Sequence, residues 1–177
     1  MCSQTESPQT ENPQIPWPDA LQRPDAAAVQ HALITFWQLL AQLPDLLNRQ
    51  EYLLADYLTF QLRSTVLDMM LALNGIQWPT GTTYLNGYLS AQQRAAIEKS
   101  MILPEVAPEG WIGRAVALLV IYRWYAPQLV NAFGLTYPQP LEDQVWHTLQ
   151  RDLADWPLTV TTDDRIDDRL TDEHAKH

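Results

Sequence analysis

The sequence predicts an all-α protein built as a single bundle of about five helices, two of them long. Apolar residues recur every three to four positions in several stretches, which is the spacing of a helix face. The β-prone stretch at residues 158–161 stands alone, so no sheet is expected. A chain of 177 residues with 46% hydrophobic content can bury one good core but has little room for a second domain.

The two ends of the chain differ in composition from the middle. Residues 1–18 contain four prolines and many polar residues, which is typical of a disordered leader. Residues 158–177 alternate acids and arginines with little apolar content, which predicts a flexible acidic tail. The helical domain is therefore expected over residues 19–157.

The first helix is expected to begin at Pro24 and Asp25, because proline suits the first turn and an acid favours the positive end of the helix dipole. Pro44 should end it, since proline cannot continue the hydrogen-bond pattern of a helix. After a short link, the next helix should begin near residue 48. The apolar residues of the first helix fall on one stripe: Val29, Leu33, Phe36, Trp37, Leu40 and Leu43.

Residues 52–79 form the stretch around which the rest is organised. They read as one long amphipathic helix that carries much of the apolar mass. The helix should end at Asn74 and Gly75, because this pair makes a good left-handed C-terminal cap. The residues that follow, up to Tyr88, mix glycine, proline and threonine with aromatics, which predicts a loop with at most a short turn.

Three more helices are expected. Ser90 and Gln93 match a capping box that opens a short helix reaching about residue 101. Residues 111–133 are apolar nearly all round in their middle, which marks a central helix, kinked at Pro127 and closed by a glycine. The last helix should cover residues 140–156.

Composition excludes several classes of function. The net charge is −10 and no cluster of Lys and Arg interleaves with aromatics, so nucleic acid is not an expected partner. The single cysteine, Cys2, allows no internal disulfide. The leader lacks the pattern of a signal peptide, and no apolar run is long enough to span a membrane. A cytoplasmic protein without a membrane partner is therefore expected.

No catalytic or metal-binding motif is present. The chain has no glycine-rich phosphate loop, no Gly-x-Ser-x-Gly elbow and no His-Glu-x-x-His. His174 and His177 are spaced so that they could bind a metal weakly. Arg169 and His174 have a spacing used by some helical RNases. Both pairs lie in the tail, and we interpret both spacings as coincidences. No cofactor or metal is expected, and catalysis by this chain alone is not predicted.

Charged residues of the long helix are candidates for a ligand site. Asp56 and Arg63 lie on nearly the same side of the helix, and Asp68 lies about 140° further round from Arg63. One interpretation places them in a polar groove beside Trp78 and Tyr84. The favoured alternative places the two acids in solvent and extends Arg63 past apolar neighbours.

Arg123 and four aromatic residues leave similar alternatives. Arg123 lies in an apolar segment and needs a partner if it is buried, so structural pairing and ligand contact both stay open. The aromatic residues form either the mouth of a pocket or, as we favour, a cover over the core. They are Trp78, Tyr84, Tyr88 and Trp111.

The order of these segments also resembles a known family. They are similar to the C-terminal helical domain of bacterial nucleotidyltransferase-fold proteins of the aminoglycoside adenylyltransferase type. The similar segments are FWQLLAQL, LADYLTFQLRSTVLDMMLALNG, TYLNGYL and IYRWYAPQLVNAFGLTYPQPLEDQVWHTL. The resemblance covers about residues 36–149. It implies a domain that helps to enclose the acceptor substrate, with matching positions at Arg63, Asp68, Asn74, Tyr84 and Arg123.

In that family a separate α/β domain, marked by Gly-Ser and Asp-x-Asp, holds Mg²⁺ for phosphoryl transfer. This sequence contains neither motif, and where relatives often carry a basic residue after the loop aromatic it has Leu85 and Asn86. The first hypothesis is therefore a non-catalytic substrate-binding or accessory module that acts with a separately encoded nucleotidyltransferase subunit. The alternative is a helical interaction module that forms a homo-oligomer or binds another helical protein.

Overall fold

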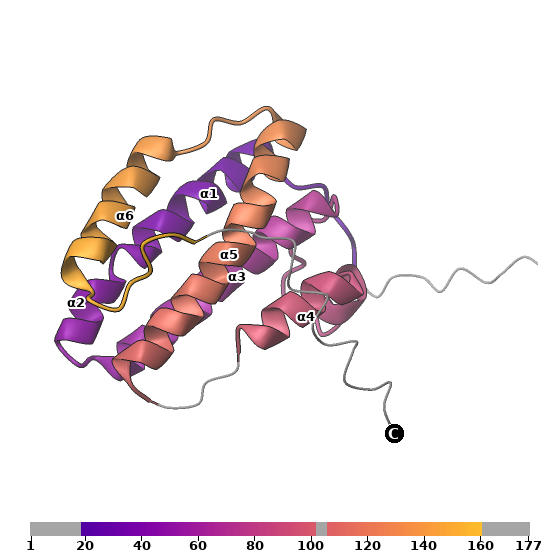
Figure 1. Cartoon of the computed structure of the whole chain (residues 1–177). Coiled ribbons are helices and arrows are strands. Elements are labelled where there is room, and N and C mark those ends of the chain that lie inside the picture. The colour runs from indigo at the N-terminus through magenta and orange to yellow at the C-terminus, as the bar shows by residue number, and fades with distance from the viewer. Residues whose placement is uncertain (1–18, 102–105, 161–177) are drawn as a thin grey trace, which may run out of the picture.

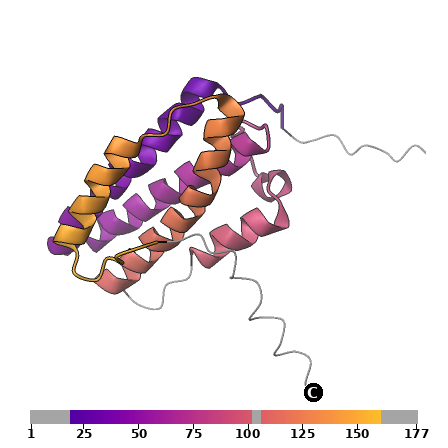
Figure 2. The ribbon, with the colours of Figure 1, turned by 45° about the horizontal axis from the view of Figure 1, so that its top comes forward.

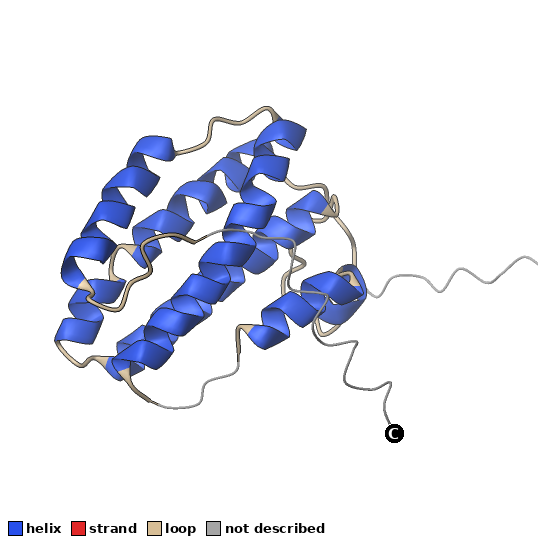
Figure 3. Ribbon diagram, in the orientation of Figure 1, coloured by secondary structure: helices blue, strands red, loops and turns tan. Residues whose placement is uncertain are grey.

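The protein is all-α, as predicted. The computed structural model describes residues 19–101 and 106–160. Its described residues form six α-helices and one 3-10 helix, and no strand occurs among them (Figures 1 and 3). The elements are α1 (Ala26–Leu40), α2 (Leu43–Asn48), α3 (Tyr52–Leu73), η1 (Leu85–Tyr88), α4 (Ala91–Lys99), α5 (Pro108–Phe133) and α6 (Gln139–Asp152).

Several sequence-based expectations lie outside the described residues. They concern the leader, Cys2, and the tail residues Arg169, His174 and His177. Within the part of the chain that is described, no helix combines the length and the apolar character needed to cross a bilayer.

The first helical segment differs from the prediction at Pro44. The helix α1 ends at Leu40, and Pro44 lies in the first turn of the short helix α2, where a link was expected. Proline is tolerated there because the first turn of a helix does not need its N–H groups for internal hydrogen bonds. Leu43, placed at the end of the first helix from the sequence, is buried in α2 instead.

The long helix α3 is the centre of the bundle. It packs against α1, α2, α4 and α5. It ends as predicted, with Asn74 as the C-cap and Gly75 in the left-handed region at φ 78°. After it the chain forms the loop that contains η1, and then the short helix α4. Figures 1 and 2 show η1 and α4 gathered on the opposite side of the bundle from α6.

The capping box at the start of α4 is confirmed. The backbone N–H of Gln93 donates to Ser90 Oγ at 3.2 Å, and the backbone N–H of Ser90 donates to Gln93 Oε1 at 2.8 Å. Two donors at the helix start are thereby satisfied by one pair of side chains.

The last two helices occur where the sequence placed them, with shifted ends. The helix α5 begins at Pro108, three residues before the predicted start, because proline suits a first helical position. It continues through Pro127 and is capped by Gly134 at φ 63°. The helix α6 ends at Asp152, although Leu153 and Trp156 beyond it are still buried.

The core contains a polar contact between aromatic residues of α1 and α5. Phe36 stacks on Tyr122 with ring centroids 4.2 Å apart. The indole N–H of Trp37 donates to the Tyr122 hydroxyl at 3.0 Å, and that hydroxyl donates to the carbonyl of Leu33 at 3.0 Å. The central position predicted for the apolar part of α5 is therefore confirmed.

The side chain of Gln30 on α1 holds the link between α5 and α6. Its amide nitrogen donates to the carbonyl of Thr136 at 3.0 Å, and its amide oxygen accepts from the N–H of Thr136 at 3.2 Å. Thr136 belongs to the link between α5 and α6. One side chain thus satisfies both backbone groups of that residue and fixes the link against α1.

Candidate ligand pocket

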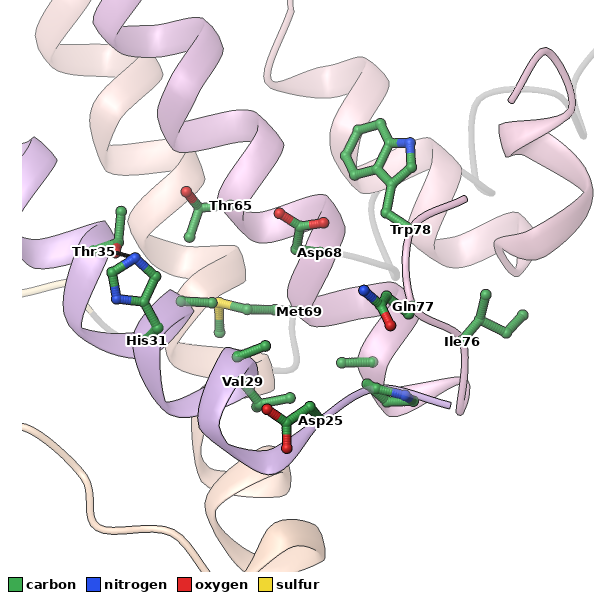
Figure 4. Close-up of a pocket in the computed structure, with 14 residues that line it drawn as sticks. Asp25, Val29, His31, Thr35, Thr65, Asp68, Met69, Ile76, Gln77 and Trp78 are labelled. Atoms are coloured by element: carbon green, nitrogen blue, oxygen red, sulfur yellow. Dashed lines mark hydrogen bonds between the residues drawn. The ribbon is translucent and has the colours of Figure 1, made fainter. Parts of the chain in front are cut away.

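A pocket of about 330 Å³ opens between α1 and α3. Residues from the first half of α1 form one side, and residues from the second half of α3 form the other (Figure 4). The segment 76–78, which leaves α3, closes one end. The pocket therefore lies where the long helix exits.

Asp68 supplies the principal charge of this pocket. It projects from α3 and is exposed to solvent through the pocket mouth, while the base of its side chain is enclosed by the pocket walls. Its carboxylate forms no hydrogen bond or ion pair with another described residue. Burial among the pocket walls raises the pKa of Asp68 to about 6, because the walls displace part of the water that stabilises the charged form. At neutral pH the group is mostly an ionised and unpaired carboxylate.

The opposite side of the pocket is polar near its rim. His31 and Thr35 lie one helical turn apart on α1, with His31 Nε2 3.2 Å from Thr35 Oγ1. Asp25, the N-cap residue of α1, adds a second carboxylate. Among the described residues that line the pocket there is no lysine or arginine. The charge of the pocket is therefore negative.

The end formed by segment 76–78 is aromatic and polar. Trp78 and Gln77 flank the same end of the pocket as Asp68 (Figure 4). The backbone N–H of Gln77 donates to the carbonyl of Gln22 at 2.8 Å. This bond ties the segment that leaves α3 to the segment that enters α1. The segments that continue the two walls are thereby linked at this end of the pocket.

Two of the six residues proposed from the sequence line this pocket, namely Asp68 and Trp78. Asn74 has a different environment. Its side-chain amide donates to the carbonyl of Tyr88 and to Gln93 Oε1, each at 2.9 Å. Asn74 therefore holds the η1 loop and the start of α4 against the end of α3.

Arg63 lies on the other flank of α3, near Asp56 and Arg114. Burial first, and then the charge of Arg114, lower the pKa of Arg63, while Asp56 raises it. The Arg63 Nε atom is buried and has no hydrogen-bond partner in the described part of the chain. Arg63 is therefore not part of the pocket.

Tyr84 is also separate from the pocket. Its ring is half exposed and makes an edge contact with the ring of Tyr88 at 5.7 Å. Tyr88 itself is buried, and its hydroxyl donates to Asp19 Oδ2 at 2.7 Å. The expectation of aromatics that cover the core is met by Tyr88 and Trp111, which is also buried.

Arg123 has the structural partner that its apolar surroundings require. It donates to Glu142 Oε1 at 2.6 Å and to the carbonyl of Val160 at 2.8 Å. Its guanidinium lies 4.7 Å from the ring centre of Trp146. Glu142 also accepts from the hydroxyl of Tyr137. Of the two alternatives for Arg123, the structure shows the pairing.

Residues of α1 are the part of the pocket that sequence reasoning missed. His31 and Thr35 are four residues apart, which places them on one face of a helix. That spacing was a usable signal, but it does not indicate which other helix lies opposite.

Comparisons with known proteins do not indicate a ligand for this pocket. Comparison of the chain with protein-family models, curated proteins and solved structures found no match. Among the described residues, no three His, Cys, Asp or Glu side chains are grouped so that they could hold a metal ion. The geometry therefore defines a helical bundle with an acidic and partly aromatic pocket between α1 and α3. A second, smaller pocket of about 270 Å³ lies on the other side of Trp78 and Gln77 and includes Asp19.

Proposed function

We propose that the chain is a non-catalytic helical module that binds a small organic cation in the pocket between α1 and α3. The observation that carries this proposal is the unpaired carboxylate of Asp68 beside Trp78 in a pocket of about 330 Å³. Small-molecule sites usually have volumes of roughly 300 to 1,000 Å³. The ligand is therefore of metabolite size.

The charge of the ligand follows from the groups in the pocket. An ionised carboxylate that is partly desolvated is stabilised by a cation placed against it. An indole face also attracts cations, by about 0.5 to 2 kcal/mol depending on how dry the contact is. Asp68 and Trp78 supply these two features at the same end of the pocket. A protonated amine or a quaternary ammonium group satisfies both.

The remaining lining favours an apolar body on that cation. Ala28, Ala32 and Ile76 line the pocket and keep apolar surface open to solvent. A short alkyl or cyclic group against them removes apolar area from water, at about 25 cal/mol per Å². The ligand class is thus an amine with a compact hydrocarbon frame.

The sequence resemblance supplies the context in which such binding would matter. In nucleotidyltransferase-fold enzymes the helical domain helps to enclose the acceptor substrate, and the chemistry takes place in another domain. We propose the same division here, with a separately encoded subunit supplying catalysis. A neighbouring reading frame that encodes Gly-Ser and Asp-x-Asp, whose product co-purifies with this chain, would support the division. Failure to co-purify would count against the separate catalytic subunit, but not against ligand binding in the pocket between α1 and α3.

Calorimetry with a panel of small primary and quaternary amines tests ligand binding. Each amine is paired with a neutral molecule of the same shape. We expect the amines alone to bind, and the variant Asp68→Asn to lose about tenfold or more in affinity, because a charged contact is lost.

The matched control is Glu98→Gln. Glu98 is exposed on α4, outside the pocket, and its loss changes the net charge by the same amount. Equal binding by wild type and Asp68→Asn, or equal binding of the neutral molecules, would refute the proposal.

A further inference from the structure

The outer face of α3 carries large apolar side chains that no described element covers. Leu53 is 89% exposed, and Tyr57 and Phe60 are each 59% exposed. Their spacing places all three on one face of the helix, with Ser64 one turn further along. We call Leu53, Tyr57 and Phe60 the α3 stripe. Scattered exposed apolar residues are normal, but an aligned set marks an interaction site.

The stripe occupies only the first half of α3. In the second half of α3 this same face is covered, because Leu67 and Leu71, on the same side as Leu53, are buried. The outer face of α3 is therefore exposed in the first half of the helix and buried in the second half. Covering the core does not explain the apolar residues of the stripe.

Two opposite charges lie on one flank of the stripe. Asp56 and Arg63 are seven residues apart, or about 10 Å along the helix, and they point in nearly the same direction. The Asp56 side chain is 67% exposed and contacts Arg114 at 3.3 Å. A carboxylate accepts several hydrogen bonds, so this contact leaves Asp56 able to accept more.

Arg63 lacks a partner of its own. Its Nε atom is buried without a hydrogen-bond partner in the described part of the chain, and no described carboxylate forms an ion pair with it. A buried guanidinium nitrogen without an acceptor is costly. The Arg63 side chain as a whole is only half-buried, and a guanidinium carries five N–H donors, so its two terminal nitrogens can still donate to a carboxylate of another molecule.

The positions of the two charges match a twofold axis. When two copies of a helix pack antiparallel about such an axis, residues on the same flank face each other at opposite heights. The midpoint between residues 56 and 63 lies next to residue 60. Placing the axis there brings Asp56 of each copy to the height of Arg63 in the other, and Phe60 against Phe60.

We propose that the α3 stripe is a homodimer interface in which two α3 helices pack antiparallel, with Phe60 at the twofold axis and reciprocal Asp56–Arg63 ion pairs. The occupant is a second copy because the surface is complementary to itself. An acidic partner would leave Asp56 repelled, and a basic partner would leave Arg63 repelled. The contact covers the Phe60 end of the stripe and gives Arg63 a carboxylate partner.

Sedimentation velocity over a range of concentrations tests the interface. We expect wild type to form a dimer, and Phe60→Asp to weaken dimerisation about tenfold or more, because an aromatic residue at the centre of an interface contributes much of its affinity. Leu158→Asp is the matched control, since Leu158 is 83% exposed outside α3. A wild type that stays monomeric, or a dimer that persists in Phe60→Asp, overturns the proposal.

Charge reversal tests the pairing itself. Asp56→Arg sets two arginines against each other in both pairs of a dimer, and Arg63→Asp sets two aspartates against each other, so each variant alone should be monomeric. Mixed together, they restore two opposite-charge pairs and should form a heterodimer. Thermal unfolding shows whether each variant is folded. Folded variants that fail to associate on mixing, or that dimerise alone, refute the reciprocal pairing.

Discussion

Asn74 and Gln93 exchange hydrogen bonds between their side-chain amides. Asn74 Nδ2 donates to Gln93 Oε1 at 2.9 Å, and Gln93 Nε2 donates to Asn74 Oδ1 at 3.2 Å. The pair joins the C-cap of α3 to the first turn of α4. Because Gln93 is buried and also completes the capping box with Ser90, the loss of either amide leaves polar groups unsatisfied.

We expect Asn74→Ala to lower the free energy of unfolding by about 1 to 3 kcal/mol, the usual cost of leaving a buried hydrogen-bond partner unsatisfied. Urea unfolding measures it. Asn131→Ala, an exposed position on α5, should change stability little. The double variant Asn74→Ala with Gln93→Ala should cost less than the two single changes added together. Strict additivity would contradict the coupling.

The raised pKa of Asp68 predicts how stability depends on pH. Burial raises the pKa from 3.8 to about 6 in the folded chain, so the folded state binds the proton more tightly than the unfolded state. The contribution of Asp68 to stability is therefore complete below pH 3.8 and is lost as the pH rises through about 6. The stability of wild type relative to Asp68→Asn should fall over that range. Parallel urea titrations of both proteins at several pH values measure the difference, and a constant difference would contradict the prediction.

The pair of Arg123 and Glu142 predicts a large loss of stability. The Glu142 side chain is only 10% exposed, so removing its partner leaves a nearly buried carboxylate without a counter-charge. We expect Arg123→Met to cost about 3 kcal/mol or more, as for other buried pairs that lose one partner. Thermal and urea unfolding measure this loss.

Two further variants separate charge from packing at this site. Adding Glu142→Gln to Arg123→Met should recover part of the stability, because no uncompensated charge is then left. Arg151→Met removes an exposed pair with Asp152 and should cost under about 1 kcal/mol. If Arg123→Met and Arg151→Met cost the same, the Arg123 pair does not stabilise the fold in the way we describe.

The helices could be predicted because their signals are local. Asn74 and Gly75 mark the end of α3, and the capping box of Ser90 and Gln93 marks the start of α4, whatever the rest of the chain does. Pro44 was ambiguous for the same reason. Proline both follows the end of one helix and opens the next, and the sequence around it does not distinguish a link from a six-residue helix.

The lining of the candidate pocket was predicted only in part, because it depends on packing between helices. The exit of α3 was identified from the sequence, and Asp68 and Trp78 do line the pocket there. Arg63 was grouped with them on helical direction, and Arg123 because it lies in an apolar segment and matches a position of the resembled family. The structure pairs Arg123 with α6 and places Arg63 on the opposite flank of α3. A helical wheel gives relative directions within one helix, but which helix lies opposite depends on the whole fold.

The double hydrogen bond of Gln30 with Thr136 has a consequence for the order of folding. The two residues are 106 positions apart, so their contact closes a long loop whose entropy cost is recovered only when the intervening helices are in place. We expect α1, α3 and α5 to associate before this contact forms. Gln30→Ala should therefore speed unfolding and leave the folding rate nearly unchanged, which stopped-flow measurements show as a φ-value near zero.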